Sequence, residues 1–206
     1  MSAKRPQPKR KYPAETLTDD EVRRLIDAIG ARGPIAVRNR ALIVLLWRSG
    51  LRISEALSLR PSDLSNGQIN VRRGKGSRQR VAFYDEVAVP YLQHWEGVRA
   101  GLGVKARQPL FCTVSKGDTR KPGDPIDPSY YRQLLPKLAR KAGVEKRVHA
   151  HGFRHTYASE LERERLRIGS IAGLLGHKHT STTDTYLRRI SGGELQDDLR
   201  SIGRSV

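Results

Sequence analysis

Residues 37–55 have the sequence VRNRALIVLLWRSGLRISE. Val37, Ala41 and Leu45 recur at the spacing of one helix face, so this stretch predicts an amphipathic helix over residues 37–49. The spacing is that of a helix that turns one side toward a core.

The residues after this helix predict a turn and a second, shorter helix. Gly50 stands where a left-handed residue commonly ends a helix. Arg52 then lies at the start of a helix predicted over residues 53–59, which ends before Pro61. The longest apolar run of the chain, Ala41–Trp47, is far too short to span a bilayer.

The sequence on both sides predicts further elements. Thr18 and Glu21 have capping-box spacing, which opens a helix through Ile29. Ile69 and Val71 alternate with polar residues, and a basic Gly-rich turn precedes a returning apolar stretch, which indicates a β-hairpin. Further helices are predicted over residues 85–99, 128–143 (with a kink at Pro136), 152–165, 168–175 and 181–190. The predicted fold class is α+β, a mainly helical domain with a small three-stranded antiparallel β-sheet.

The charge of the chain indicates a polyanionic partner. Thirty-nine Lys and Arg residues stand against 21 Asp and Glu residues, giving a formal charge of +18. Such a chain attracts nucleic acid, because neutralising phosphates releases condensed counterions. A merely solubilising surface is the plain alternative, and an anionic membrane a weaker one, since no long basic amphipathic helix is present. The lone Cys112 excludes an internal disulfide and favours a reducing compartment.

The ends of the chain differ from its centre. Residues 1–14 are basic and Pro-rich, which predicts a flexible arm; the alternative is a tail that serves solubility alone. The arm's candidate DNA-binding residues are Lys4, Arg5, Lys9, Arg10 and Lys11. Residues 15–190 form the predicted catalytic domain. Residues 191–206 form a polar tail, in which Leu195, Leu199 and Ile202 make a small apolar stripe suited to docking on a second subunit.

Four separated motifs carry the polar residues of interest. They are SGLRISE at Ser49–Glu55, Lys75 at the hairpin tip, HGFRH at His151–His155, and LLGH at Leu174–His177, with Tyr186 nine residues later. Each has an ordinary alternative when taken alone. Arg52 can form a surface ion pair with Glu55, and a tyrosine such as Tyr186 commonly packs with its hydroxyl at the edge of a core.

Taken together, these side chains suit one reaction. Two arginines, a lysine and two histidines supply donors and positive charge for a phosphodiester in a pentacoordinate state. A tyrosine is a usable nucleophile where a cationic cluster stabilises its phenolate. The sequence has no acidic cluster of the divalent-metal nuclease kind and no ATP-binding Gly-rich loop, so it predicts no metal and no cofactor.

The four motifs, in this order and at these separations, resemble the catalytic domain of the tyrosine recombinases, or phage integrases. The resemblance covers about residues 16–190. In most relatives a helical core-binding domain precedes the catalytic domain. The short segment before residue 16 resembles that of the small fimbrial phase-variation invertases, which lack this domain, and the alternative is a piece of a longer protein. Arg165 departs from the family pattern, because relatives usually have a helix-ending glycine there.

The resemblance implies a role for each motif residue. Arg52 and Arg154 would clamp the non-bridging oxygens of the scissile phosphate, and His177 would donate to one of them. Lys75 would be the general acid, His151 would assist proton transfer, and Tyr186 would attack to form a 3′-phosphotyrosyl link. Glu55 and His155 would support the residues that touch the phosphate.

The resemblance also implies partners and a reaction class. We expect a site-specific recombinase that acts on double-stranded DNA as a tetramer with an accessory DNA-bending protein, in the cytoplasm at the nucleoid and without a membrane. Two alternatives stay open. One is a type IB topoisomerase, which uses a similar residue set, although the Leu-Gly-His and Ser-Thr-Thr context of Tyr186 favours a recombinase. The other is a DNA-binding regulator that is catalytically silent.

Overall fold

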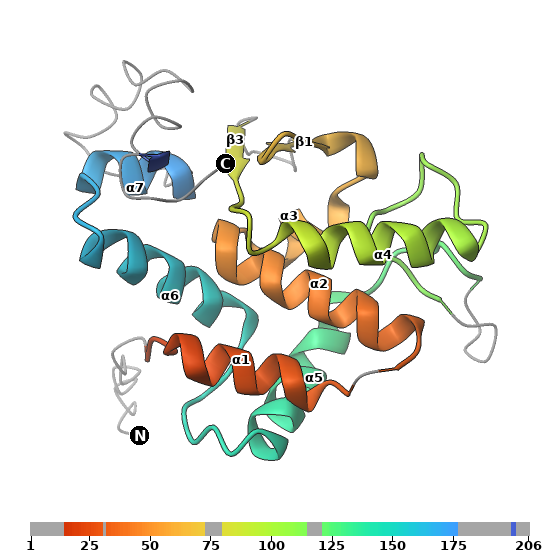
Figure 1. The fold of residues 1–206 in the computed structure, drawn as a ribbon, viewed down its shortest axis with the longest axis horizontal. Coiled ribbons are helices and arrows are strands. Elements are labelled where there is room, and N and C mark those ends of the chain that lie inside the picture. Colours follow the sequence, from red (N-terminus) through yellow and green to blue (C-terminus); the bar gives the residue numbers. More distant parts are fainter. Residues whose placement is uncertain (1–14, 31, 73–79, 115–120, 177–198, 201–206) are drawn as a thin grey trace, which may run out of the picture.

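The protein is described by a computed structural model, which covers residues 15–30, 32–72, 80–114, 121–176 and 199–200. It confirms a mainly helical domain with a small three-stranded antiparallel sheet (Figure 1). The elements are α1 (Asp19–Ala28), α2 (Pro34–Ser49), α3 (Ile53–Ser58), the short 3₁₀ helix η1 (Pro61–Asp63), β1 (Leu64–Ser65), β2 (Gln68–Val71), β3 (Arg80–Phe83), α4 (Val89–Gly101), α5 (Pro128–Lys141), α6 (Ala150–Arg163) and α7 (Ile168–Leu175).

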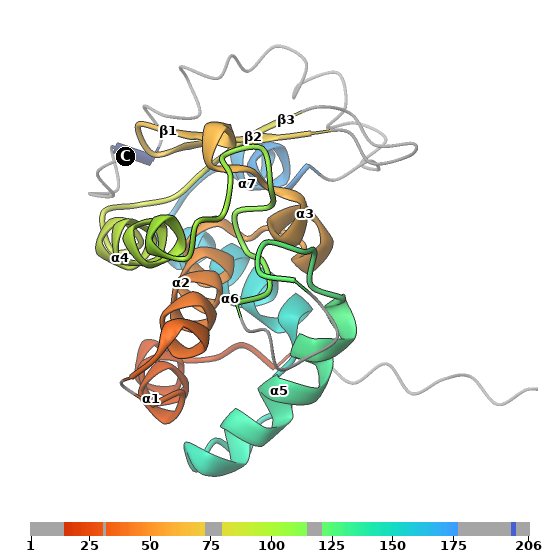
Figure 2. The same cartoon turned by 90° about the vertical axis from the view of Figure 1, so that its right-hand side faces the viewer.

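Helix α2 lies at the centre of the domain and packs against α1, α3, α4, α6 and β3. The sheet with α3 lies on one side of it, and α1 with α5 lies on the other (Figures 1 and 2). Its apolar run is buried on every face, which fits a helix enclosed by other elements. It begins three residues before the predicted start, at Pro34, since proline at a first helical turn loses no backbone hydrogen bond.

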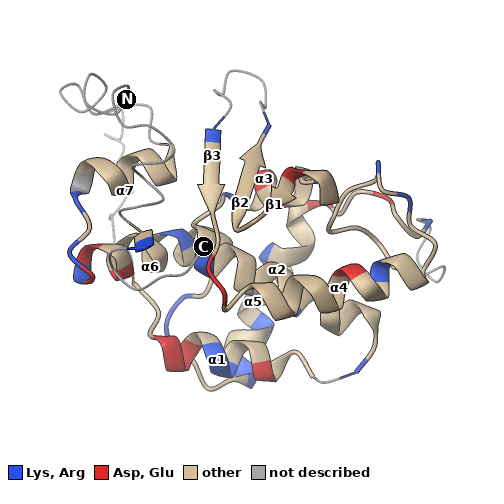
Figure 3. Cartoon of the chain, turned by 45° about the horizontal axis from the view of Figure 1, so that its top comes forward, with Lys and Arg blue, Asp and Glu red and all other residues tan. Residues whose placement is uncertain are grey.

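The first helix begins as the sequence predicts. The Thr18 hydroxyl accepts from the backbone N–H of Glu21 at 3.2 Å, and the Glu21 carboxylate accepts from that of Thr18 at 2.7 Å. This reciprocal pair satisfies two backbone donors that a helix start leaves open. Lys146 also donates to Glu21 at 2.7 Å, which ties α1 to the segment before α6. The acidic first turn of α1 is visible in Figure 3.

Other helix boundaries shift from the predicted ones. Helix α4 begins at Val89 rather than at residue 85, because Asp85 lies in a turn and accepts from the backbone of Val87 at 3.1 Å. Helix α5 continues through Pro136 and ends at Lys141. Helix α6 begins two residues before the predicted start, and the helix predicted over residues 181–190 lies outside the described residues.

The sheet has the order β1-β2-β3, and its hairpin projects from the helical body (Figure 3). Strand β2 pairs with β3 in the register Ile69↔Ala82, and the alternating burial of β2 turns Ile69 and Val71 toward the core. Asn66 and Gly67, both at positive φ, connect β1 to β2. An Asn-Gly pair favours the tight turn that matches the twist of paired strands. This dipeptide therefore allows β1 to pair with β2 and complete the three-stranded sheet.

A second, smaller hydrophobic cluster is built around α6 and α7 beside β3. Its buried members are Phe83, Tyr157, Leu161, Leu166, Ile171, Leu174, Leu175 and Leu199. Leu199 is only 2% exposed and packs against its own chain. The other two residues of the predicted tail stripe, Leu195 and Ile202, lie outside the described part of the chain.

Two further features follow from the sequence analysis. Arg165 adopts a positive φ of 63° after α6, the left-handed conformation for which relatives are expected to use glycine. Among the described helices, none combines the length and apolar character needed to cross a membrane.

Candidate active site

The turn between α2 and α3 contains a glycine whose replacement by a larger residue would require neighbouring side chains to shift. Gly50 has a φ of 61°, and a Cβ atom built on it would lie 2.6 Å from Cδ1 of Tyr157 and 2.8 Å from Cδ2 of Leu175. These side chains come from α6 and α7, so the turn makes close contact with both helices. The sequence pattern Ser-Gly-Leu-Arg therefore places Arg52 two residues after this contact, close enough to α6 to interact electrostatically with Arg154.

Arg52 is the residue before the first turn of α3 and is paired with Glu55. The Glu55 carboxylate accepts from the backbone N–H of Arg52 at 2.8 Å and from its Nη1 at 2.9 Å. The Arg52 side chain remains 43% exposed. The expected ion pair thus exists, and it holds a guanidinium at the surface of the domain.

Arg154 is buried in α6, with only 2% of its surface exposed. Its Nη1 donates to the carbonyl of Gly50 at 2.9 Å, and its Nη2 donates to the carbonyl of Leu175. Burial lowers its pKa to about 10; repulsion from Arg52 and Arg80 adds to this effect, and attraction to Glu55 opposes it. The guanidinium is therefore charged at neutral pH and close enough to Arg52 for the two to repel each other.

Arg80, the first residue of β3, belongs to the same cluster and was missed by the sequence analysis. Its Nη2 donates to Glu55 Oε2 at 3.0 Å, and its Nη1 donates to the carbonyl of Leu174 at 2.7 Å. Burial acts to raise the pKa of Glu55, but attraction to Arg80 and hydrogen bonds from Arg52 outweigh it and hold that pKa below its usual value. Glu55 is therefore a carboxylate shared by two arginines.

Two histidines of α6 lie next to the arginines. The rings of His151 and His155 are 4.6 Å apart between centroids and nearly perpendicular. Burial lowers the pKa of each, and repulsion from neighbouring histidines and from Arg154 acts in the same direction. The site therefore favours neutral imidazoles, which can accept a proton. His149, which the sequence analysis did not single out, is the residue before the first turn of this helix and is among the groups that lower both pKa values.

The residue that ends α7, Gly176, is a glycine because of its backbone conformation and its contact with Arg80. Gly176 has a φ of 63°, and a Cβ atom there would lie 2.5 Å from Cδ of Arg80. This explains the glycine of the Leu-Leu-Gly-His motif, because the left-handed cap and the packing of Arg80 both exclude a side chain.

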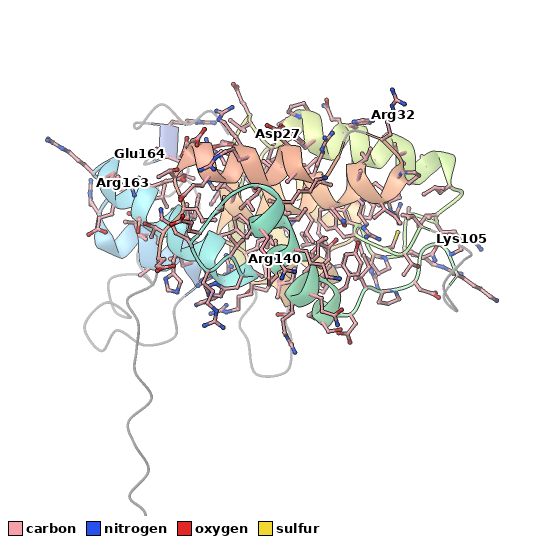
Figure 4. The ribbon with its side chains drawn as sticks, turned by 90° about the horizontal axis from the view of Figure 1, so that it is seen from below. Asp27, Arg32, Lys105, Arg140, Arg163 and Glu164 are labelled. Carbon is pink, nitrogen blue, oxygen red and sulfur yellow. The ribbon has the colours of Figure 1, made fainter. Side chains whose placement is uncertain are left out.

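The structure thus brings together five of the predicted residues, Arg52, Glu55, His151, Arg154 and His155, although they come from segments about a hundred residues apart. Lys75, His177, Tyr186 and the basic arm lie outside the described residues. Two guanidinium groups beside neutral imidazoles form a site that can bind a phosphate and move a proton. By contrast, Arg32, Lys105 and Arg140 lie well apart from one another in Figure 4.

Within the described residues, no group of three or more His, Cys, Asp or Glu side chains is placed to hold a metal ion. The expectation that the reaction needs no metal remains a prediction, and a chelation experiment tests it below.

Comparison with known proteins places this arrangement among its relatives. The family model described as the phage integrase family matches residues 15–191. Tyrosine recombinase XerC of Rickettsia bellii (strain OSU 85-389) is 36% identical over 195 residues, which cover 91% of this chain and 60% of the relative. Tyrosine recombinase XerA of Thermococcus kodakarensis is 36% identical over 177 residues, 84% of this chain and 58% of the relative.

Solved structures show the same similarity. A crystal structure of XerA recombinase superposes with a TM-score of 0.69 at 28% identity, covering 91% of this chain and 64% of that one. XerH site-specific recombinase bound to difH substrate, in a pre-cleavage complex, gives 0.66 at 26% identity, with 85% and 50% covered. The chain therefore spans about 60% of the length of the curated relatives it matches.

Proposed function

The chain belongs to the phage integrase family, and on that premise we propose that it is a site-specific DNA recombinase that cleaves and rejoins strands through a 3′-phosphotyrosyl intermediate. The observation that carries the proposal is that Arg154 donates to the carbonyl of Gly50, two residues before Arg52. Glu55 accepts hydrogen bonds from both Arg52 and Arg80. The motifs identify the candidate residues, and this geometry supports a role for Arg52 and Arg154 at the same phosphate.

The proposed mechanism assigns the described residues to charge and proton handling. Arg52, whose side chain is 43% exposed, binds the non-bridging oxygens of the scissile phosphate. Arg154 donates to the carbonyls of Gly50 and Leu175 and adds its positive charge to the site. Charge that develops on the phosphate oxygens in the transition state is stabilised by this positive charge. Glu55 fixes Arg52, and His155 packs on His151, whose lowered pKa suits uptake of the phenolic proton.

The remaining steps use residues outside the described part of the chain. The Tyr186 hydroxyl oxygen attacks phosphorus, the bond from phosphorus to the 5′ oxygen breaks, and Lys75 protonates that leaving oxygen while His177 donates to the phosphate. The products are a 3′-phosphotyrosyl link and a free 5′ hydroxyl. Because the phosphodiester bond energy is retained in the link, a 5′ hydroxyl from another strand reverses the step.

The partners belong to the same proposal. XerH was solved bound to its difH site, which supports duplex DNA with a specific recombination site as the substrate of this chain. We propose that it acts as a tetramer at the nucleoid with an accessory DNA-bending protein, and that the arm at residues 1–14 contacts neighbouring phosphates. We also propose that the tail at residues 191–206 docks on a second subunit through residues other than Leu199, because Leu199 is buried in this chain's own cluster around α6 and α7.

A trapping experiment tests the proposed function. DNA enriched by the chain from a random pool is converted to duplexes nicked near the cleavage position, so that a short leaving strand diffuses away. We expect a slowly migrating protein–DNA adduct on a denaturing gel, mapping to Tyr186. Tyr186→Phe removes the nucleophile but leaves the arginines, so it should bind in a gel shift and give no adduct.

Three outcomes would contradict this. An adduct formed by Tyr186→Phe, or mapped to another tyrosine, would refute the nucleophile. Binding without any adduct would identify a silent DNA-binding regulator. Relaxation of supercoiled plasmid at all sites, with no strand exchange between paired sites, would identify a type IB topoisomerase.

A further inference from the structure

Arg80 joins three elements of the candidate site. It begins β3, and its two Nη groups donate to different elements, Nη2 to Glu55 on α3 and Nη1 to the Leu174 carbonyl on α7. Only 13% of its side chain is exposed. A guanidinium can serve two acceptors in fixed directions, whereas a lysine ammonium offers a point charge without that planar fork.

Arg80 shares one hydrogen-bond partner with Arg52, and its other partner is next in the chain to a partner of Arg154. Glu55 also binds Arg52, and the carbonyl of Leu175, next to Leu174, accepts from Arg154. Arg154 in turn donates to Gly50, two residues before Arg52. The hydrogen bonds therefore close a ring in which Arg80 is the only described side chain linking the α3 carboxylate to the end of α7.

We propose that Arg80 is a positioning residue for strand cleavage, which orients Arg52 through Glu55 and holds the end of α7 against Arg154. The inference deepens the proposed function and rests on it. Arg80 differs from Arg154, whose Nη groups donate to backbone carbonyls, because Arg80 forms an ion pair with the Glu55 carboxylate at 3.0 Å, so its charge is already compensated within the protein. Its contribution is the geometry and charge of the Arg52–Glu55 pair.

The pH dependence of cleavage separates this role from a purely structural one. Glu55 is faced by Arg52 on α3, Arg80 on β3 and, at longer range, Arg154 on α6. Attraction to Arg80 helps to keep the Glu55 pKa low, so its removal raises that pKa. As the pH falls, a carboxylate with a raised pKa becomes protonated sooner, that is, at a higher pH. Arg52 then loses its negatively charged partner. Cleavage by an Arg80 variant should therefore fail at a higher pH than cleavage by the wild type.

Arg48 offers a matched control. Its side chain is also 13% exposed, and its ion-pair partners are Asp85 at 2.7 Å and Glu160 at 3.3 Å rather than Glu55. Arg48→Gln removes a buried, paired guanidinium of the same kind elsewhere in the domain. It should lower thermal stability at least as much as Arg80→Gln.

The experiment measures adduct formation at saturating protein on the nicked substrate, from about pH 4 to 9, for the wild type, Arg80→Gln, Arg80→Lys, Arg48→Gln and Glu55→Gln. We expect Arg80→Gln to slow the saturated rate by up to about 100-fold, the scale of a misplaced reacting group. Its acid limb should move to higher pH, and its binding affinity should change little. Arg80→Lys should recover part of the rate, and Arg48→Gln should leave the pH profile unchanged.

A double variant decides whether Arg80 acts through Glu55. In Glu55→Gln the side chain carries no titratable group, so adding Arg80→Gln should cost far less than it does in the wild type and should not move the acid limb. Independent, multiplicative losses would overturn the inference, and so would an unshifted acid limb in the single variant. If the wild type itself forms no adduct, the proposed function fails and the inference falls with it.

Discussion

Replacing Gly50 by alanine should destabilise the domain far more than the same change at another glycine of equal conformation. Gly143 is the matched control, because its φ is 63° against 61° for Gly50. A Cβ atom at Gly143 would meet only Nη1 of Arg24 at 3.8 Å, whereas at Gly50 it would overlap Tyr157 and Leu175. The two variants therefore share the backbone cost and differ in the packing cost.

The magnitudes follow from these two terms. A left-handed conformation costs an alanine about 1–2 kcal/mol, and the loss of unfolded-state freedom relative to glycine offsets about 0.4–1 kcal/mol of that. Gly143→Ala should thus lower the free energy of unfolding by about 1 kcal/mol. Gly50→Ala carries in addition the roughly 1–3 kcal/mol typical of overpacking a core, for a total loss of about 2–4 kcal/mol.

Urea unfolding followed by far-UV circular dichroism measures both free energies of unfolding. The assay should give similar slopes for the two variants and a lower midpoint for Gly50→Ala. Because Arg154 donates to the Gly50 carbonyl, this variant should also lose adduct formation under conditions in which it remains folded. Equal destabilisation of the two variants would refute the close packing of the turn against α6 and α7.

Other predictions concern the chemistry, the arm and one strained residue. Lys75→Ala should slow cleavage by roughly 10²–10⁴-fold as a lost general acid; a 5′-bridging phosphorothiolate substrate should restore its rate but not that of Arg52→Ala, and equal impairment on both substrates would assign Lys75 to phosphate binding. Cleavage should proceed at a similar rate in excess EDTA, and a loss that Mg²⁺ restores would overturn the metal-free mechanism. Deletion of residues 1–14 should weaken binding to all sequences and reduce the salt slope by about one unit per lost phosphate contact, as measured by gel shifts over a salt series; an unchanged slope would leave the arm as a tail. Arg165→Gly should raise the free energy of unfolding by up to about 1 kcal/mol, because glycine relieves the positive φ at some entropic cost, and a lower urea midpoint would contradict this.

Elements with local signals were predictable from the amino-acid sequence. The Thr18–Glu21 capping box and the left-handed Gly50 each depend on residues within one turn of the chain, and the structure has both. The fold class and the family were likewise predictable, because the order and spacing of the motifs can be recognised from the sequence without knowledge of the packing. Among the site residues, the pairing of Arg52 with Glu55 was foreseeable from their spacing at the start of a helix.

How those residues act together depends on contacts between segments that are distant in the sequence. Arg80 carries no local mark that separates it from the other arginines of a very basic chain, and its role depends on carbonyl and carboxylate partners on α7 and α3. Helix α4 begins late because Asp85, beside Arg48 of α2, lies in a turn, and Leu199 is buried because α6 and α7 form a cluster around it. Hydrogen bonds and burial between distant segments leave no periodicity in the sequence, so Arg154, Gly50 and Leu175 meet only when three helices pack.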